Sequence, residues 1–82
     1  MKDRERDQLR KTILKMIKQG HTRWTNLKKR VLGSCHPWAT DATFRRQIRY
    51  LLDARCIQRA NHGSYVLTVK GRKYLEVLEV LC

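Results

Sequence analysis

The segment Phe44–Leu75, which reads FRRQIRYLLDARCIQRANHGSYVLTVKGRKYL, decides the fold because its hydrophobic spacing changes along its length. In its first part the strongly apolar residues repeat at i, i+4, i+7 and i+8, which predicts a helix with one buried stripe over about residues 40–54. Thr40 is a suitable N-cap, and Asp41 places a carboxylate in the first turn, where the helix dipole favours it. The predicted stripe consists of Phe44, Ile48, Leu51 and Leu52.

The pattern changes after Ala54 and predicts a β-hairpin over about residues 56–68. Two short runs, CIQRA and SYVLT, flank the turn signal NHG, in which Asn61 and Gly63 tolerate positive φ. Thr68 can cap a closing helix that follows the hairpin. The expected inward positions are Ile57, Tyr65 and Leu67 in the hairpin and Tyr74, Val77, Leu78 and Leu81 in the closing helix.

Two further helices are predicted upstream of this segment. The first covers residues 3–19 and ends at Gly20, because glycine readily adopts the left-handed conformation of a helix end. The second is expected to begin at Asn26, with Thr25 as its cap, and Pro37 requires a turn after it. The expected core positions are Leu9, Ile13, Met16 and Ile17 in the first helix and Leu27, Val31 and Leu32 in the second.

The length and charge of the chain narrow its class. Its 82 residues are enough for one domain, over residues 1–82, with a small core. The 19 Lys and Arg residues against 7 Asp and Glu residues give a net charge of +12, which favours a polyanionic partner; an anionic membrane surface would satisfy the same charge. No apolar run reaches the ~18–20 residues of a spanning helix, and the charged start MKDRERDQLRK does not resemble a secretory signal, so we expect a cytoplasmic protein without a membrane segment.

The predicted elements form an α+β fold that is mostly α, and their order resembles the winged helix-turn-helix family of DNA-binding domains. In MarR-like and PadR-like regulators of this family, a helix that ends in a leucine pair is followed by x-x-G-L-I-x-R…Y-x-L-T-x-x-G. The matching positions here are Leu51-Leu52, Cys56-Ile57-Gln58-Arg59, Tyr65-Val66-Leu67-Thr68 and Gly71. The resemblance implies a three-helix core, a two-stranded β-hairpin wing and a C-terminal helix; the connection GSCHPWAT is longer than the family's usual turn.

The third helix carries the candidate base-reading residues. Steps of ~100° place Ala42, Arg46 and Arg49 opposite its buried stripe. A major groove admits a helix, and arginine suits the paired acceptors of guanine, so we predict double-stranded DNA binding with Arg46 and Arg49 as the principal base readers. A solvated surface is the alternative explanation for each arginine. The full set of candidates is Ala42, Thr43, Arg45, Arg46, Arg49 and Tyr50.

Other cationic or polar residues are candidates for contacts with phosphates or the neighbouring minor groove. Thr40 and the amides at the start of the third helix can hold a phosphate. The second helix should cross the DNA backbone, and the wing should reach the adjacent groove, although turn geometry alone also explains NHG. These candidates are Thr40, Lys28, Lys29, Arg30, Arg59, Asn61, His62 and Ser64, and the first helix adds Lys2, Arg4, Arg10 and Lys11.

The sequence contains no catalytic set, and we expect neither an enzyme nor a bound cofactor or small-molecule ligand. The cysteines and histidines lack the C-x₂₋₄-C or H-x₃₋₅-H spacing of zinc sites, so no metal is expected. Cys56 is predicted to be a small buried hydrophobe at the start of the hairpin. The residues considered as ligands were His21, Cys35, His36, Cys56 and His62.

Three apolar residues, Leu14, Leu75 and Val80, lie outside the predicted core stripes of the terminal helices. They are candidates for a homodimer interface, which the resembled regulators commonly form through terminal helices; covering the edge of a small core is the alternative. Two other functions remain open. A winged helix can bind only proteins, and the same charge can bind RNA, although the few aromatic residues are better explained by packing than by base stacking.

Overall fold

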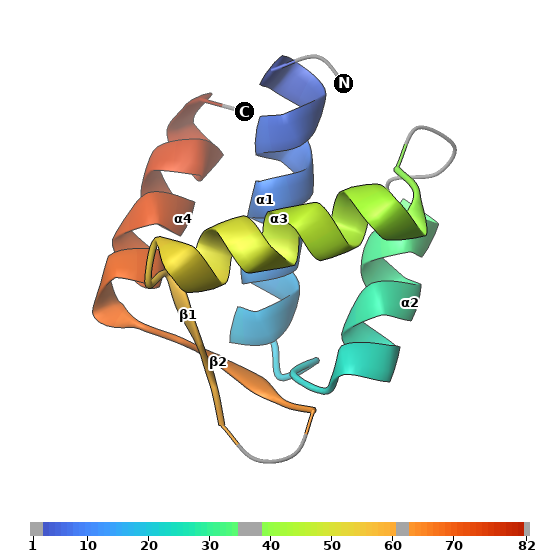
Figure 1. Ribbon diagram of the computed structural model, residues 1–82. Helices are drawn as coiled ribbons and strands as arrows, with labels where there is room; N and C mark the ends of the chain where they lie inside the picture. Colours follow the sequence, from blue (N-terminus) through green and yellow to red (C-terminus); the bar gives the residue numbers. More distant parts are fainter. Residues whose placement is uncertain (1–2, 35–38, 61–62, 82) are drawn as a thin grey trace.

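The computed structural model describes residues 3–34, 39–60 and 63–81, and these residues form four helices and one two-stranded antiparallel sheet. In Figure 1, α3 crosses over α1. Helix α2 lies on one side of α1 and α4 on the other, and the hairpin projects away from both chain ends. The fold is therefore α+β and mostly helical. In chain order the elements are α1 (Asp3–Lys18), α2 (Trp24–Ser34), α3 (Asp41–Asp53), β1 (Ile57–Arg59), β2 (Tyr65–Leu67) and α4 (Val69–Leu81).

The start of α2 differs from its prediction. The helix begins at Trp24, two residues before the predicted start, so Thr25 lies in its first turn and is not its cap. The hairpin explains the difference, because the amide of Trp24 donates to the carbonyl of Gly63 at 2.7 Å. An isolated β-bridge between Arg23 and Ser64 lies directly beside this bond. A tertiary contact has therefore taken over the role of a local cap.

The other two predicted threonine caps, Thr40 and Thr68, are confirmed. Thr40 Oγ1 accepts a hydrogen bond from the amide of Thr43 at 3.2 Å, at the start of α3. Thr68 Oγ1 accepts from the amide of Gly71 at 3.0 Å and donates to the carbonyl of Arg55 at 2.6 Å. This second cap therefore also ties α4 to the end of α3.

Helices α1 and α3 end with the same backbone geometry. Gly20 has a φ of 102°, as predicted for the end of α1, and Arg55 has a φ of 62° after α3. In both cases the next amide returns to a carbonyl five residues earlier, which is the Schellman arrangement. The bonds are His21 N to Met16 O at 3.0 Å and Cys56 N to Leu51 O at 2.9 Å.

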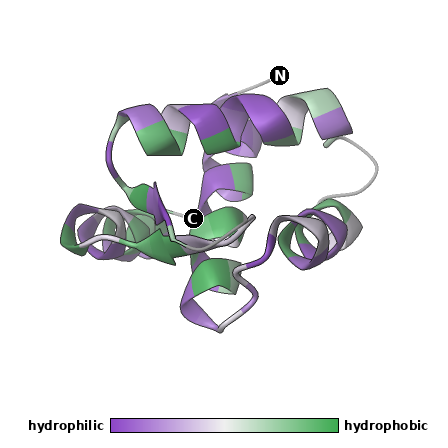
Figure 2. Ribbon diagram, turned by 60° about the horizontal axis from the view of Figure 1, so that its bottom comes forward, coloured by the Kyte–Doolittle hydropathy of each residue, from purple (hydrophilic) through white to green (hydrophobic). Residues whose placement is uncertain are grey.

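The core lies beneath α3, between α1, α2, the hairpin and α4. Figure 2 shows the corresponding hydrophobic stripes on the inner sides of the helices and hydrophilic outer sides. The predicted stripes of the first three helices are confirmed, with Met16, Leu32 and Leu52 only half-buried. The most completely buried large side chains are Phe44, Leu9, Ile13, Leu14, Leu27, Leu51, Ile57, Leu75, Leu78 and Val31.

The predicted inner face of α4 is partly wrong. Val77 and Leu81 are 52% and 71% exposed, whereas Leu75 is fully buried. The reason is Gly71, because a Cβ at this position would overlap the carbonyl oxygen of Cys56. The helix turns this glycine toward Cys56, the residue before β1, and the residues one and two turns later, Leu75 and Leu78, then face the core.

Leu14, which was expected to lie at the surface of α1, is also fully buried. Helix α1 contacts α2, α3, α4 and β2, so its buried face is much wider than one apolar stripe. Neither α1 nor any other helix in the described residues is long and apolar enough to cross a bilayer.

Candidate nucleic-acid interface

The outer face of α3 presents the residues that the helical spacing placed there. Ala42, Arg46 and Arg49 are exposed, Thr43 is half-buried, and Tyr50 is 43% exposed. Within residues 3–34, 39–60 and 63–81, neither Arg46 nor Arg49 forms an ion pair or a side-chain hydrogen bond. These two guanidinium groups are therefore available to a ligand.

Arg45, on one shoulder of α3, has partners within the protein. Its Nε lies 2.8 Å from Asp41 Oδ2, and its guanidinium carbon lies 5.8 Å from the centre of the Trp24 ring. Asp41 Oδ1 also lies 2.6 Å from Lys28 Nζ. The hydrogen bond from Lys28, assisted by the charge of Arg45, holds the pKa of Asp41 below its ordinary value. The phosphate candidate Lys28 is thus half-buried and paired, whereas Lys29 and Arg30 are exposed.

The other shoulder of α3 packs against a buried arginine of α1. Arg10 was expected among the exposed cations of α1, but it is only 8% exposed, and that expectation is wrong. Its guanidinium carbon lies 3.6 Å from the centre of the Tyr50 ring. Its Nε donates to Gln47 Oε1 at 2.7 Å, and its Nη1 donates to the hydroxyl of Tyr74 at 3.2 Å. Arg10 therefore joins α1, α3 and α4, and it holds the base-reading candidate Tyr50 in place.

A signal of this cluster was present in the sequence. Gln47 lies within the apolar stripe of α3, between Phe44 and Leu51 at helical spacing, and only 4% of it is exposed. A polar group at such a position needs a buried partner. The sequence did not identify that partner, because Arg10 lies 37 positions away.

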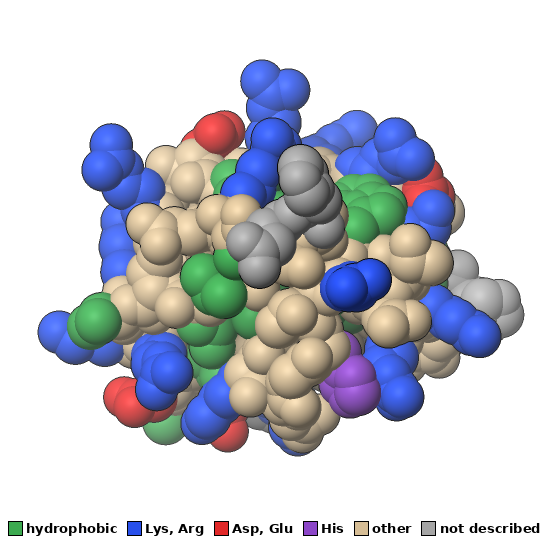
Figure 3. All heavy atoms as spheres, turned by 90° about the horizontal axis from the view of Figure 1, so that it is seen from below, with side chains coloured by type: hydrophobic (Ala, Val, Ile, Leu, Met, Phe, Trp, Pro, Cys, Tyr) green, Lys and Arg blue, Asp and Glu red, His purple; other side chains and the backbone are tan. Residues whose placement is uncertain are grey.

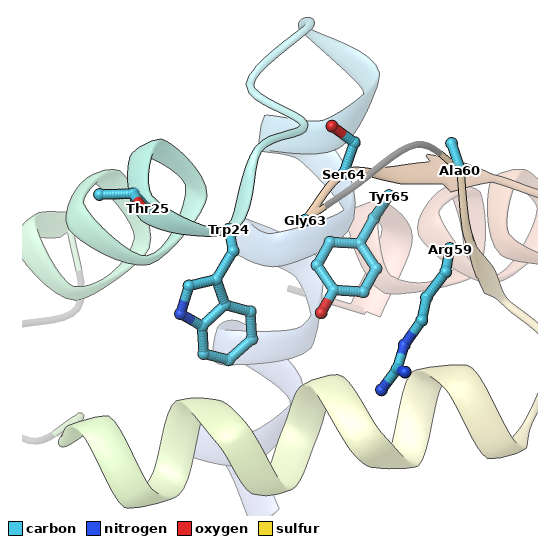
Figure 4. Close-up of a pocket in the computed structure, with 7 residues that line it drawn as sticks. All are labelled: Trp24, Thr25, Arg59, Ala60, Gly63, Ser64 and Tyr65. Carbon is cyan, nitrogen blue, oxygen red and sulfur yellow. The ribbon is translucent and has the colours of Figure 1, made fainter.

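An open hollow runs along the hairpin and has two lobes that share lining residues. The larger lobe, of about 760 Å³, lies between the start of α2 and the hairpin, and the smaller lobe, of about 570 Å³, lies between α3 and the hairpin. Figure 4 shows the larger lobe, in which Trp24 and Tyr65 stand side by side and Arg59 extends from the hairpin toward α3. Trp24, Tyr65 and Arg59 line both lobes. The charged residues of the smaller lobe are Arg45, Arg49, Asp53 and Arg59.

Trp24 and Tyr65, which line this hollow, belong to an aromatic cluster that also includes Phe44. The ring of Trp24 lies 5.1 Å from the ring of Phe44 and 6.2 Å from that of Tyr65, measured between ring centres. Phe44 and Tyr65 are buried and Trp24 is half-buried. The start of α2, the first turn of α3 and β2 are therefore held together by one set of contacts.

The hairpin directs Arg59 toward α3, whereas the side chain of Ser64 points away from α3 and lines only the larger lobe. Arg59 is exposed and Ser64 is half-buried, while the predicted wing contacts Asn61 and His62 lie outside the described residues. Figure 3, a view from the hairpin end, shows Lys and Arg side chains around the rim of this face and few acidic ones. The face is therefore positively charged.

The candidate metal ligands that the structure describes are not gathered into a site. Within the described ranges, no three His, Cys, Asp or Glu residues lie together; Cys35, His36 and His62 lie outside those ranges. Cys56 is buried, as predicted, and its burial raises the pKa of the thiol. The thiol therefore stays protonated at neutral pH.

Two of the three dimer candidates are not at the surface. Leu14 and Leu75 belong to the core, which corrects the expectation that they form a seam. Val80 is 86% exposed and lies on an outer side of α4 that it shares with the exposed Lys70 and Lys73. The other exposed apolar residues of this helix are Val69, Val77 and Leu81.

Comparison of the chain with protein-family models, with curated proteins and with solved structures found no match in any of the three.

Proposed function

We propose that this protein is a winged helix-turn-helix domain that binds double-stranded DNA. In this proposal α3 enters the major groove, and the hairpin contacts the neighbouring backbone or groove. The net charge of +12 and the basic side chains around the hairpin end support a polyanionic partner.

One observation carries the proposal: α3 is anchored by the buried residues Phe44, Ile48 and Leu51 and leaves Arg46 and Arg49 exposed without partners in the described residues. Such a helix can enter a groove without giving up internal ion pairs. Arg46, with Ala42 one turn before it, occupies the outermost line of the helix. In this position an arginine can pair with guanine, and a methyl group can contact thymine.

Other exposed cations serve as contacts with the phosphates. Lys29 and Arg30 lie on α2, Arg59 lies on the hairpin, and each is exposed. Such contacts fix orientation without reading sequence. Lys28 and Arg45 contribute less, because both already pair with Asp41.

Binding to a random-sequence duplex at increasing salt tests the proposal. Engagement of ~6–10 phosphates predicts a loss of affinity of roughly 10³–10⁵ between 50 and 200 mM salt. Arg46→Ala should weaken binding to a selected target by ~1–3 kcal/mol and relax specificity at one base pair. Arg72→Ala, which removes an exposed arginine from α4, is the matched control. An affinity that does not vary with salt would refute DNA binding, and a preference for hairpin RNA over duplex would favour the RNA alternative.

Homodimerisation through α4 is a second proposal, because this helix carries the exposed apolar residues described above. Two antiparallel copies of α4 would place Lys73 of each near Glu76 of the other, which adds opposite charges to the apolar contact. Sedimentation under reducing conditions should show a dimer at high micromolar concentration, and Val80→Lys should give a monomer. A monomeric wild-type protein under these conditions would exclude this interface.

A further inference from the structure

We infer that the hollow between α3 and the hairpin is a phosphate site, in which Arg49 and Arg59 hold one phosphodiester group of a DNA strand. The inference rests on the proposed function and adds to it a specific contact between the hairpin and the DNA backbone. It assigns the hairpin arginine to a phosphate, not to the adjacent minor groove.

The convergence of arginines from two elements is the first argument. Arg49 comes from α3 and Arg59 from β1, and both line the smaller lobe. In Figure 4 the side chain of Arg59 extends from the hairpin toward α3, into the hollow. Guanidinium groups that approach each other repel, and an anion between them converts this repulsion into attraction.

The balance of charge around the lobe is the second argument. Arg45 contributes only in part, because Asp41 occupies its Nε. Asp53 also lines the lobe and opposes an anion. Neither Arg49 nor Arg59 has an ion-pair partner in the part of the chain that the structure describes. These two residues therefore dominate the site.

One further polar group of the hollow favours an oxyanion. Tyr65 lines both lobes, and within the described residues its hydroxyl makes no hydrogen bond, whereas the indole nitrogen of Trp24 points away from Arg59. In Figure 4 the hydroxyl of Tyr65 points toward α3 and the ring of Trp24 stands beside it. A tetrahedral phosphate accepts several hydrogen bonds at once and suits the planar fork of arginine.

This site divides the arginines of α3 into two roles. Arg49 faces the hollow and holds the backbone, whereas Arg46 and Ala42 on the outermost line remain directed at the bases. With a phosphate held at its edge, α3 has a defined depth and register in the groove. Substitution of Arg49 should therefore weaken binding to all sequences similarly, and substitution of Arg46 should change sequence preference.

The site can be tested without DNA, with inorganic pyrophosphate as the probe. In a Trp38→Phe background Trp24 is the sole tryptophan, so its emission reports on the hollow. At constant ionic strength we expect a saturable change, weakened at least about fivefold by Arg49→Gln or Arg59→Gln and within about twofold of the parent in Arg72→Gln. The inference would be overturned if the parent gave no saturable response, or if the Arg59→Gln variant bound pyrophosphate as tightly as the parent. Circular dichroism of each variant verifies folding.

A duplex titration separates this inference from the proposed function. A plot of log K against log salt has a negative slope, whose magnitude grows by about 0.9 for each phosphate contact. In the Arg49→Gln/Arg59→Gln double variant this magnitude should be smaller by about 0.9, the value for one lost phosphate contact. A decrease of about 1.8 would mean two separate phosphates, and an unchanged slope would mean none; either result overturns the shared site but leaves DNA binding intact. Absence of salt-dependent duplex binding by the parent protein would instead refute the proposed function, whatever the pyrophosphate result.

Discussion

Arginines lie beside both shoulders of α3, buried on one side and exposed on the other. On one shoulder Arg10 is 8% exposed and stacks on Tyr50 at 3.6 Å. On the other, Arg49 and Arg59 are exposed and face an open hollow. The comparison shows that an arginine side chain can have either of two roles. It supports the fold where neutral partners surround it and exclude water, and it is available to a ligand where it faces solvent.

The energetics of the two shoulders differ for the same reason. A buried guanidinium has lost its hydration, so its stability depends on Gln47, Tyr74 and the face of Tyr50. An exposed guanidinium keeps its water and contributes little to folding. We therefore expect substitutions on the first shoulder to change stability and substitutions on the second to change binding.

The largest loss of stability should follow a substitution of Gly71 in α4, which packs against Cys56 directly before β1, the strand that carries Arg59. A methyl group on Gly71 would overlap the carbonyl of Cys56, so α4 or the strand must shift. Gly71→Ala should destabilise the protein by about 3 kcal/mol in urea unfolding. Gly33→Ala is the matched control, because no atom lies within 4 Å of its Cβ position in α2. The control should stabilise by about 0.5–1 kcal/mol; equal effects of the two substitutions would contradict the predicted close contact.

The unfolding free energies of the Arg10→Ala and Arg49→Ala variants test the comparison of the two shoulders directly. Loss of Arg10 leaves the buried Gln47 oxygen without its donor and removes the stacking partner of Tyr50, so we expect a loss of about 2–3 kcal/mol of unfolding free energy. Arg49→Ala should change stability by less than about 0.5 kcal/mol. Arg10→Met combined with Gln47→Leu should recover much of the loss, because both polar partners are then removed. Similar losses from Arg10→Ala and Arg49→Ala would mean that the two shoulders do not differ in this way.

An increase in stability is expected from Arg55→Gly. Arg55 ends α3 with a φ of 62°, a conformation that costs a non-glycine residue roughly 1 kcal/mol. The variant should therefore unfold at a higher temperature, by an amount equivalent to about 0.5–1 kcal/mol. Gln58→Gly, in an exposed strand position, serves as the control and should destabilise. If Arg55→Gly also destabilises, the side chain of Arg55 must make a compensating contribution.

The smallest effect concerns Asp41, which links α2 to the hollow side of α3. Its pKa is lowered by Lys28 and Arg45, so its ion pairs stabilise the fold above the unfolded-state pKa and are lost as the pH falls through the folded-state pKa. Asp41→Asn should lower the melting temperature at pH 7 and have no effect in strong acid. Asp53→Asn is the control, since Asp53 forms no ion pair with the described residues. A melting-temperature difference that persists undiminished in strong acid would exclude the charge as its cause.

Much of the fold followed from local patterns. The stripes of the first three helices, the caps Thr40 and Thr68 and the turn residue Gly63 are all where the spacing and turn chemistry predicted them. The exposure of Arg46 and Arg49 followed from the same periodicity. These properties depend on residues within one or two turns of each other, so they can be predicted from the order of residues.

The errors involve contacts between distant segments. The early start of α2 depends on the carbonyl of Gly63, and the rotation of α4 depends on the carbonyl of Cys56. The burial of Leu14 and Arg10 depends on the central position of α1. No periodicity within a single helix reports which other elements surround it.

The types and order of the elements, the buried stripe of α3 and the excess positive charge follow from the order of residues alone, because these depend on composition and local geometry. Which arginines are buried and which are exposed depends on the tertiary structure. The tertiary structure also brings Arg49 and Arg59 to one hollow, although they lie on different elements. The physical reason is that burial and convergence of charge depend on how the helices and the hairpin pack, and packing is set by contacts between residues far apart in the chain.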